Sequence, residues 1–244
     1  MAEIVRCEFL KLKHSRICSS VFLATLVTPL LVLMLTIRRL AAGEQIPLFG
    51  FYDSAFVFLM PLFGPLIFSI AAAFLFGREY TEKTLKTIFA VPVSKVKFLL
   101  GKHIALFLSI LILMVLTWAE ILAVAAICNL IFGIRQLVPM VAIRFLITMI
   151  QGAVLLYAVI TPIAYIAIRS RGFFAPVLIA TVISLSDVIL TGSPIAAYFP
   201  WTATYLLVTG QGGDAAGIAY LLIGAVCFIS IAESVRYFKR TDIL

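Results

Sequence analysis

Charged side chains are scarce in this sequence of 244 residues, because Asp, Glu, Lys and Arg together make up only 12% of it while hydrophobic residues make up 64%. Soluble domains carry about 25% charged and about 45–50% apolar residues. So large an apolar excess cannot be hidden in one soluble core, and the mean hydropathy of +1.18 indicates that lipid is the main solvent. The scarcity of charge therefore excludes a soluble globular protein.

Residues that bind metals or act as catalytic bases are also rare. The two histidines are His14 and His103, and the four cysteines are Cys7, Cys18, Cys128 and Cys227. They form no C-x-x-C pair and no spacing typical of a metal site, which argues against a metalloenzyme and against a Ser-His protease within the membrane. Gly101-Lys102 lacks the upstream glycine of a P-loop and is followed by His103, so the sequence predicts no nucleotide site of this kind.

Long apolar runs are what the sequence does contain. A membrane-spanning helix needs about 20 apolar residues. Runs bounded by charge, Gly or Pro predict six spans, at about Ile17–Ile37, Phe56–Phe76, Ile104–Phe132, Ala142–Ala167, Phe174–Leu190 and Ile218–Val235. No soluble linker separates them, so the sequence predicts a single all-α, polytopic membrane domain over residues 1–244.

The basic residues are distributed unequally between the two sides of this arrangement. Of the 19 Lys and Arg residues, all but Arg38, Arg39, Arg135 and Arg144 lie before the first span, after the sixth, or in alternate connections. Basic residues favour the cytoplasmic side, so both termini are expected in the cytoplasm of a bacterial cell. The formal net charge is +8, but the basic residues are not interleaved with exposed aromatic residues as in nucleic-acid-binding proteins. No nucleic-acid partner is therefore expected.

Residues 1–16 and 193–209 do not fit a plain six-span pattern. In the first segment Val5, Phe9 and Leu12 share one helical face, which predicts a helix lying in the membrane interface, with a solvated basic tail as the alternative. The second segment is apolar, aromatic and too short to span twice, and we expect a re-entrant element there. A plain extracellular loop is its alternative. The residues that define the re-entrant element are Pro194, Tyr198, Pro200 and Trp201.

The connection Gly77–Lys102 between the second and third spans is longer than a turn requires. Thr81 to Val91 contains no Gly or Pro and places Leu85, Ile88 and Phe89 on one face, which predicts a surface helix over about residues 79–91 that ends before Pro92. Ser94 is expected to cap the next helix. Such a surface helix either docks another protein or packs on the chain's own spans.

Four polar residues interrupt the predicted spans: Glu120, Arg144, Gln151 and Asp187. Intramembrane charges usually pair or face water. At 1.5 Å per residue, Arg144 and Asp187 lie about 3 and 5 Å inside the outer ends of their spans, which predicts that they pair within a subunit or across a dimer. The alternative is that Arg144 reaches the lipid headgroups and Asp187 caps a turn. Glu120 either makes a polar contact in the translocation path or across a dimer seam, or has a structural role. The structural alternative is a hydrogen bond to a neighbour such as Thr117 or Gln151, or a protonated carboxyl in the core.

The sequences EFLKLKHSR and FGREYTEKTLKTIFAVPVSKVKFLLGK resemble the permease subunits of type-2 ABC exporters. The family pattern R-E-x(4)-T-L-x(6)-P-V-S-x(7)-K is matched at Arg78-Glu79, Thr84-Leu85, Pro92-Val93-Ser94 and Lys102. Many members have Gly where Lys83 stands, a change that we expect to leave the helix pattern intact. The segment YFPW at Tyr198–Trp201 is most similar to permeases for bacitracin resistance or lantibiotic immunity.

This resemblance implies a role for each irregular segment. The first cytoplasmic connection would be a coupling helix seated on a separate ABC ATPase, and a re-entrant element would precede the sixth span. The implied partners are two ATPase copies, a second permease chain and membrane lipids. ATP and Mg would be bound by the ATPase and no cofactor by this chain. The residues expected to couple to the ATPase are Arg78, Glu79, Thr84, Leu85, Ile88, Phe89, Pro92 and Ser94.

The leading interpretation is a non-catalytic permease that exports a hydrophobic or amphipathic substrate, such as a peptide antibiotic. Export of drugs or lipids is equally compatible with six apolar spans. A membrane enzyme acting on lipids would need clustered Asp, His or Arg at one membrane face, which the sequence does not show. A peptide-sensing or scaffold protein also remains open.

Overall fold

The computed structural model describes the chain except residues 14, 45, 47–49, 89–93, 134–137 and 241–244. Of the described residues 88% are helical and none forms a strand, which confirms the expected all-α architecture. The first half contains α1 (Ala2–Lys13), α2 (Arg16–Thr25), α3 (Val27–Ala41), α4 (Gly50–Phe58), η1 (Leu59–Phe63), α5 (Gly64–Thr81) and α6 (Leu85–Ile88). The second half contains α7 (Lys95–Phe132), α8 (Pro139–Ser170), α9 (Phe174–Leu190), η2 (Ala196–Tyr198), α10 (Pro200–Val208), η3 (Gly213–Ala215) and α11 (Ala216–Arg240).

Five of the described helical segments are long and apolar enough to cross a membrane. They are Ser19–Ala41, Gly50–Thr81, Lys95–Phe132, Pro139–Ser170 and Gly213–Arg240. The chain is therefore a multi-pass membrane protein. α9 is apolar but shorter, and its 17 residues reach only about 26 Å along the helix axis, slightly less than the hydrocarbon thickness of about 30 Å.

α8 is the central helix of the bundle and packs against α5, α7, α9, α10 and α11. Small residues allow this close approach. A Cβ at Gly152 would lie only 2.3 Å from the Cε atom of Met60 and 3.2 Å from that of Met114, so a larger residue there would have to push these side chains of η1 and α7 aside. The central position of α8 follows from such close contacts on several sides.

The long second span is interrupted by η1, one turn of π-helix. Pro61 lies within it and has no N–H to donate to the preceding turn, so a regular α-helical bond cannot form there. η1 contacts both α9 and α10. The proline therefore widens the helix where two later helices meet it, a feature that the apolar run alone does not predict.

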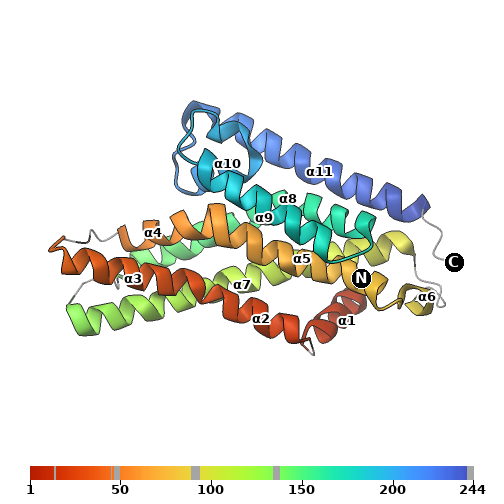
Figure 1. The fold of residues 1–244 in the computed structure, drawn as a ribbon, viewed down its shortest axis with the longest axis horizontal. Coiled ribbons are helices and arrows are strands. Elements are labelled where there is room, and N and C mark those ends of the chain that lie inside the picture. Colours follow the sequence, from red (N-terminus) through yellow and green to blue (C-terminus); the bar gives the residue numbers. More distant parts are fainter. Residues whose placement is uncertain (14, 45, 47–49, 89–93, 134–137, 241–244) are drawn as a thin grey trace.

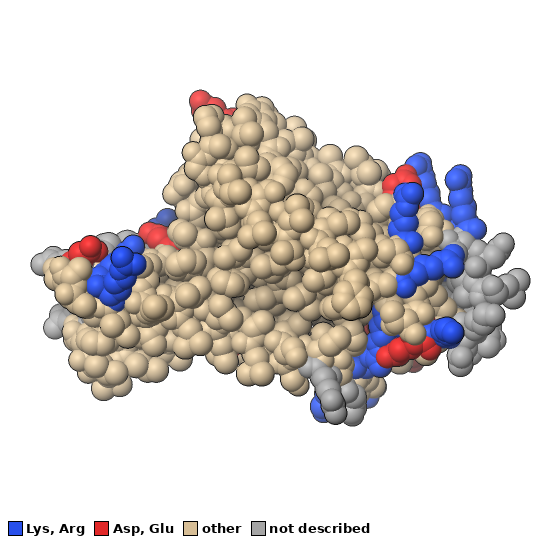
Figure 2. Space-filling view, viewed as in Figure 1, with Lys and Arg blue, Asp and Glu red and all other residues tan. Residues whose placement is uncertain are grey.

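The N-terminus and the end of α11, the last described helix, lie at the end of the bundle that also carries α1 and α6 (Figure 1). On the face seen in Figure 2, Lys and Arg gather at this end, and the middle of the molecule shows almost no charge. We call it the basic end; its described basic residues include Lys11, Lys13, Arg78, Lys83, Lys95, Lys97, Arg169, Arg171, Arg236, Lys239 and Arg240. The opposite end is called the far end. A charge-free band between two charged ends is typical of a membrane protein.

α1 forms over the segment for which an interfacial helix is expected, and it packs against α7 and α2. Its location at a membrane surface stays a prediction. η2 and α10 occupy most of the segment for which a re-entrant element is expected. The depth of these two helices in a membrane also stays a prediction.

Candidate functional site

Four charged side chains meet inside the basic end, and we call them the four-charge cluster: Glu8, Lys11, Glu79 and Lys102. The Lys102 Nζ atom lies 2.6 Å from Glu79 Oε2 and 3.3 Å from Glu8 Oε2. Lys11 Nζ lies 2.8 Å from Glu8 Oε1 and 3.3 Å from Glu79 Oε1. Each carboxylate thus joins two ammonium groups, and the cluster has no net charge.

The cluster is mostly closed to solvent. The side chains of Glu8, Glu79 and Lys102 are each 3% exposed, whereas Lys11 is 36% exposed. Lys102 also donates a hydrogen bond to the carbonyl oxygen of Leu75. Losing one partner of a buried ion pair typically costs about 3–5 kcal/mol, because the other charge remains buried alone. The cluster therefore fixes α1, α5 and α7 to one another.

Lys11 connects this buried cluster to the surface. Burial lowers the pKa of Lys11, but the carboxylates of Glu8 and Glu79 outweigh that effect and raise its pKa above the ordinary value. Arg78 donates a hydrogen bond to the carbonyl oxygen of Lys11 and pairs with Glu82 at 2.8 Å. The end of α5 is thus bound to α1 by both side-chain and backbone contacts.

A glycine on α7 allows α1 to lie this close. A Cβ at Gly101 would lie 2.6 Å from the Cγ2 atom of Ile4 on α1. Lys102, the next residue, carries the ammonium group of the cluster. The Gly101-Lys102 pair therefore supplies both the space and the charge that hold α1 against α7.

The surface helix expected over residues 79–91 is not continuous, and that prediction was wrong. α5 runs on through Arg78 and Glu79 to Thr81 and ends in a turn in which Lys83 has a φ of +55°. The Thr84 N–H donates to Glu79 O and the Lys83 N–H donates to Tyr80 O, the bonding of a helix end that normally places Gly at the left-handed position. Lys83 thus ends the helix, contrary to the expectation that it leaves the pattern intact.

The connection between α5 and α7 is consequently shorter than expected, residues 82–94 instead of Gly77–Lys102. Within it α6 is a single helical turn, Leu85–Ile88. Leu85 is buried in the chain's own core and Ile88 packs against that core in part. Phe89 and Pro92 lie outside the described residues. Ser94 stands at the N-cap position of α7, but its side chain makes no capping hydrogen bond.

A cavity of about 220 Å³ lies at the surface beside this connection. Its lining residues are Lys11, Arg78, Glu79, Glu82, Thr84 and Ile88. Four of these residues belong to the set expected to couple to the ATPase: Arg78, Glu79, Thr84 and Ile88. The cavity also borders the four-charge cluster, at Lys11 and Glu79. A side chain entering this cavity from a partner protein would contact the residues that bind α1 to α5.

Glu120 lies on α7 and is half-buried. Its Oε1 atom accepts a hydrogen bond of 3.0 Å from Thr25 Oγ1 on α2, while its buried Oε2 atom has no partner. The neighbours proposed from the sequence make other bonds. Thr117 donates to the carbonyl of Leu113, and Gln151 donates to the Tyr220 hydroxyl at 3.1 Å.

Asp187 is fully buried, and neither of its carboxylate oxygens has a hydrogen-bond partner. The Thr202 hydroxyl of α10 lies beside it but outside hydrogen-bonding geometry. No ion pair joins Asp187 to Arg144, so their expected pairing within one subunit is wrong. Equal depth along two helices does not fix the direction in which each side chain points, and these two point to different neighbours.

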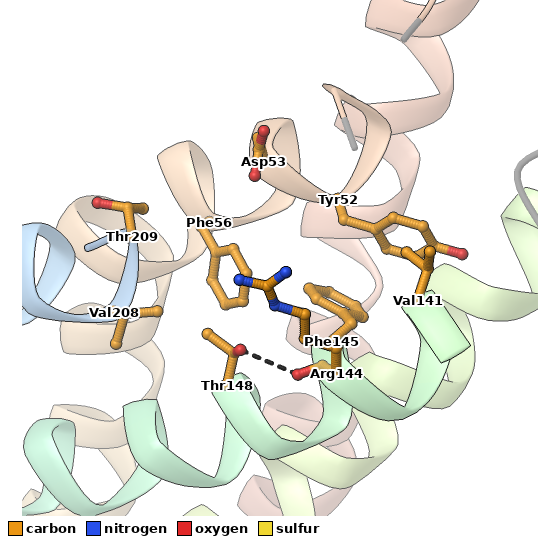
Figure 3. A pocket seen from close by; sticks show the side chains of 9 residues that line it. All are labelled: Tyr52, Asp53, Phe56, Val141, Arg144, Phe145, Thr148, Val208 and Thr209. Atoms are coloured by element: carbon orange, nitrogen blue, oxygen red, sulfur yellow. Dashed lines mark hydrogen bonds between the residues drawn. The ribbon is translucent and has the colours of Figure 1, made fainter. Parts of the chain in front are cut away.

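Arg144 instead lines a cavity of about 350 Å³ at the far end, which we call the far-end hollow (Figure 3). Its guanidinium group extends into the hollow, and Asp53 stands at the rim. α4 contributes Tyr52, Asp53 and Phe56, α8 contributes Arg144, Phe145 and Thr148, and the end of α10 contributes Val208 and Thr209. The hollow therefore joins three helical elements.

The expected re-entrant residues lie around η2 and the start of α10. Pro194 and Tyr198 are exposed, and Pro200 begins α10. The Trp201 ring packs against Phe199, with ring centroids 5.3 Å apart. The rest of α10 is mostly buried and packs among α8, α9 and α11.

The role of Glu8 and Lys11 was missed by the sequence analysis, which counted Lys11 only as a basic residue before the first span. Their i, i+3 spacing in an otherwise basic segment is the available signal. Within the described part of the chain, no three His, Cys, Asp or Glu side chains gather as a metal site would require.

The sequence of this chain is similar to those of known transport proteins. The model of the ABC-2 family transporter protein matches residues 4–187. The bacitracin transport permease protein BCRB of Bacillus licheniformis is 24% identical over 193 residues, which cover 77% of this chain and 89% of that protein. The match to the family model includes most of α1, the four-charge cluster and α6.

Proposed function

The chain belongs to the ABC-2 family of transporter proteins, and we propose that it is the permease subunit of an exporter driven by a separate ABC ATPase. The proposed substrate is a hydrophobic or amphipathic peptide antibiotic such as bacitracin or a lantibiotic. The similarity to a bacitracin transport permease supports this choice of substrate. The chain itself is a transport component, and ATP and Mg are bound by the ATPase in this proposal.

We propose six spans, the five long helical segments and α9. The positions of the first and last described residues support an even number of crossings, because both lie at the basic end (Figure 1). The gathering of Lys and Arg there supports a cytoplasmic location for that end. In this orientation α1 lies at the inner membrane surface and α10 enters the outer half of the bilayer.

The observation that carries the coupling proposal is the cavity of about 220 Å³ beside α6. It is open at the basic end, and Glu79 in its lining also belongs to the four-charge cluster. A displacement of the connection by the ATPase would therefore reach α1, α5 and α7 together. Two ATPase copies and a second permease chain, identical or related, complete the proposed assembly.

Co-purification with the ABC ATPase tests this docking site. Ile88→Asp places a charge in the cavity lining and should detach the ATPase, whereas Ile88→Val keeps an apolar side chain and should not. Ile88 is a better test than Leu85, because Leu85 is buried in the core and its replacement would disturb folding. Full retention of the ATPase by a monodisperse Ile88→Asp variant would refute docking at this cavity.

A second candidate is export of a lipid or an apolar drug. It is favoured by a cavity of about 350 Å³ between α1, α2, α5 and α7, which is lined almost entirely by apolar residues such as Phe9, Phe22, Phe74 and Leu106. Lys13 also lines it. Competition between bacitracin and a lipid for export by the complete transporter distinguishes the two substrates.

A further inference from the structure

The far-end hollow contains two opposite charges that do not neutralise each other. Arg144 and Asp53 both line it, yet no ion pair or hydrogen bond joins either charged group to another described residue. Figure 3 shows the Arg144 guanidinium extending into the hollow with Asp53 at its rim. Two unpaired and opposite charges around one cavity suit a ligand that itself carries both an anion and a cation.

The remaining lining residues fit such a ligand. The guanidinium can donate several hydrogen bonds to a phosphate. The Thr148 and Thr209 hydroxyls donate to backbone carbonyls, which leaves their oxygens able to accept from an ammonium group beside Asp53. The volume of about 350 Å³ lies within the usual range of small-molecule sites.

Three packed aromatic rings on one side of the hollow give it a defined shape. The Phe145 ring lies 4.8 Å from the Tyr52 ring and 5.1 Å from the Phe56 ring, measured between centroids. Phe145, Tyr52 and Phe56 are all buried. Contacts of this kind between rings stabilise their relative position, so α4 and α8 present the two charges from a defined framework.

The surroundings indicate a lipid as the source of the ligand. On α8, large apolar side chains next to Arg144 in sequence or one turn away are strongly exposed: Met140 at 76%, Ile143 at 56% and Ile147 at 62%. Acyl chains can lie along these residues while a headgroup enters the hollow. Arg144 lies in the second turn of α8, close to the end of the helix, where headgroups are expected.

We propose that the far-end hollow binds the zwitterionic headgroup of a phosphoethanolamine lipid, with the phosphate on Arg144 and the ammonium group on Asp53. The lipid would join α4, α8 and the end of α10, and so hold the proposed re-entrant segment against the bundle. This inference rests on the membrane location of the chain and is independent of the exported substrate.

Lipid retention by the purified full-length chain tests the proposal. The chain is placed in nanodiscs that contain equal amounts of phosphatidylethanolamine and phosphatidylglycerol, and the lipids that remain bound are counted by native mass spectrometry. Wild type should prefer phosphatidylethanolamine, and Asp53→Asn should reduce that preference about tenfold, because only this lipid carries the ammonium group. Arg144→Gln should reduce the retention of phosphatidylethanolamine about tenfold and should weaken phosphatidylglycerol as well, because both lipids carry the phosphate. The matched controls Arg38→Gln and Glu44→Gln change exposed charges outside the hollow lining and should leave the preference unchanged.

Other outcomes would overturn the proposal. Equal retention of both lipids by wild type would contradict a headgroup-specific site. A loss of lipid in Arg144→Gln but not in Asp53→Asn would indicate a plain anion site. Displacement of the bound lipid by bacitracin would assign the hollow to the peptide, and dissociation of a dimer by Arg144→Gln would make this face an interface between two copies of the chain.

Discussion

Lys102 on α7 and Glu79 on α5 form an ion pair of 2.6 Å in which both side chains are 3% exposed. The two residues are 23 positions apart and enclose the whole connection that contains α6. Both belong to the sequence pattern that resembles ABC exporter permeases. The pair therefore closes the base of the segment proposed to meet the ATPase, and Glu8 and Lys11 extend it to α1.

Replacing Lys102 with Met should destabilise the chain by about 3–5 kcal/mol, because Glu79 and Glu8 would share only the ammonium group of Lys11. Adding Glu79→Gln should recover part of this loss, since one buried charge is then removed. Thermal unfolding of the purified chain measures both effects. Lys97→Met, at an exposed position on α7, is the control. A double variant less stable than Lys102→Met alone would contradict the pairing.

Lys83→Gly should stabilise the chain by about 1 kcal/mol, because Lys83 occupies a left-handed conformation that costs non-glycine residues about 1–2 kcal/mol. The same change at Lys97, inside α7, should destabilise the chain by about 1 kcal/mol. Opposite shifts in the unfolding temperature would confirm the helix end at residue 83. A loss of stability in both variants would show that α5 continues through this residue.

Asp187→Asn should change stability by less than about 1 kcal/mol, because the carboxylate oxygens have no partner to lose and the amide has nearly the same size. Asp187→Lys should be much more damaging, since it buries a longer charged side chain. Asp214→Lys, on a surface turn, is the matched control. Expression and detergent-solubilised unfolding temperature measure the differences.

Severe loss in Asp187→Asn would instead mean that the charge has a partner in the assembled transporter, which requires a rearrangement because Asp187 is fully buried within one chain. Arg144 of a second copy is the residue to examine in that case. Exchange of the two charges, Asp187→Arg with Arg144→Asp, should then restore assembly after loss in each single variant. Without such recovery, pairing across a dimer is excluded as well.

Glu120→Gln should keep the hydrogen bond from Thr25, because the amide oxygen can replace Oε1. If the bond is only structural, export and expression both stay unchanged, while Thr25→Ala lowers stability by about 1 kcal/mol. A loss of export with normal expression in Glu120→Gln would assign a transport role to the charge. Thr117→Ala tests a bond that stays within α7 and serves as the comparison.

The apolar runs predicted the helices well because spans must be long, apolar and internally hydrogen-bonded. The expected range Phe174–Leu190 coincides with α9. The exact ends of α5 and α7 were less predictable, since both helices continue past their apolar parts into charged residues. The main error was the helix end at Lys83. A glycine there would have indicated a left-handed residue and the end of a helix, whereas a lysine gives no such signal.

The contacts of the candidate site could not be predicted from hydrophobic periodicity, because they depend on how helices far apart in the sequence pack together. Glu8 and Lys102 are 94 positions apart, and only the packing of α1 on α7 brings them together. Arg144 and Asp187 were placed at similar depths, but depth along a helix says nothing about direction around it. The family pattern did identify Glu79 and Lys102, although it did not indicate that they pair.

The central claim, that this permease exports a peptide with energy supplied at the basic end, is tested most directly in proteoliposomes containing the chain and its ABC ATPase. With ATP supplied on the ATPase side, we expect bacitracin to stimulate hydrolysis and to accumulate on the opposite side, and we expect Ile88→Asp but not Ile88→Val to abolish both effects. Bacitracin transport that proceeds without the ATPase, or hydrolysis and transport that are unchanged in Ile88→Asp, would contradict the account.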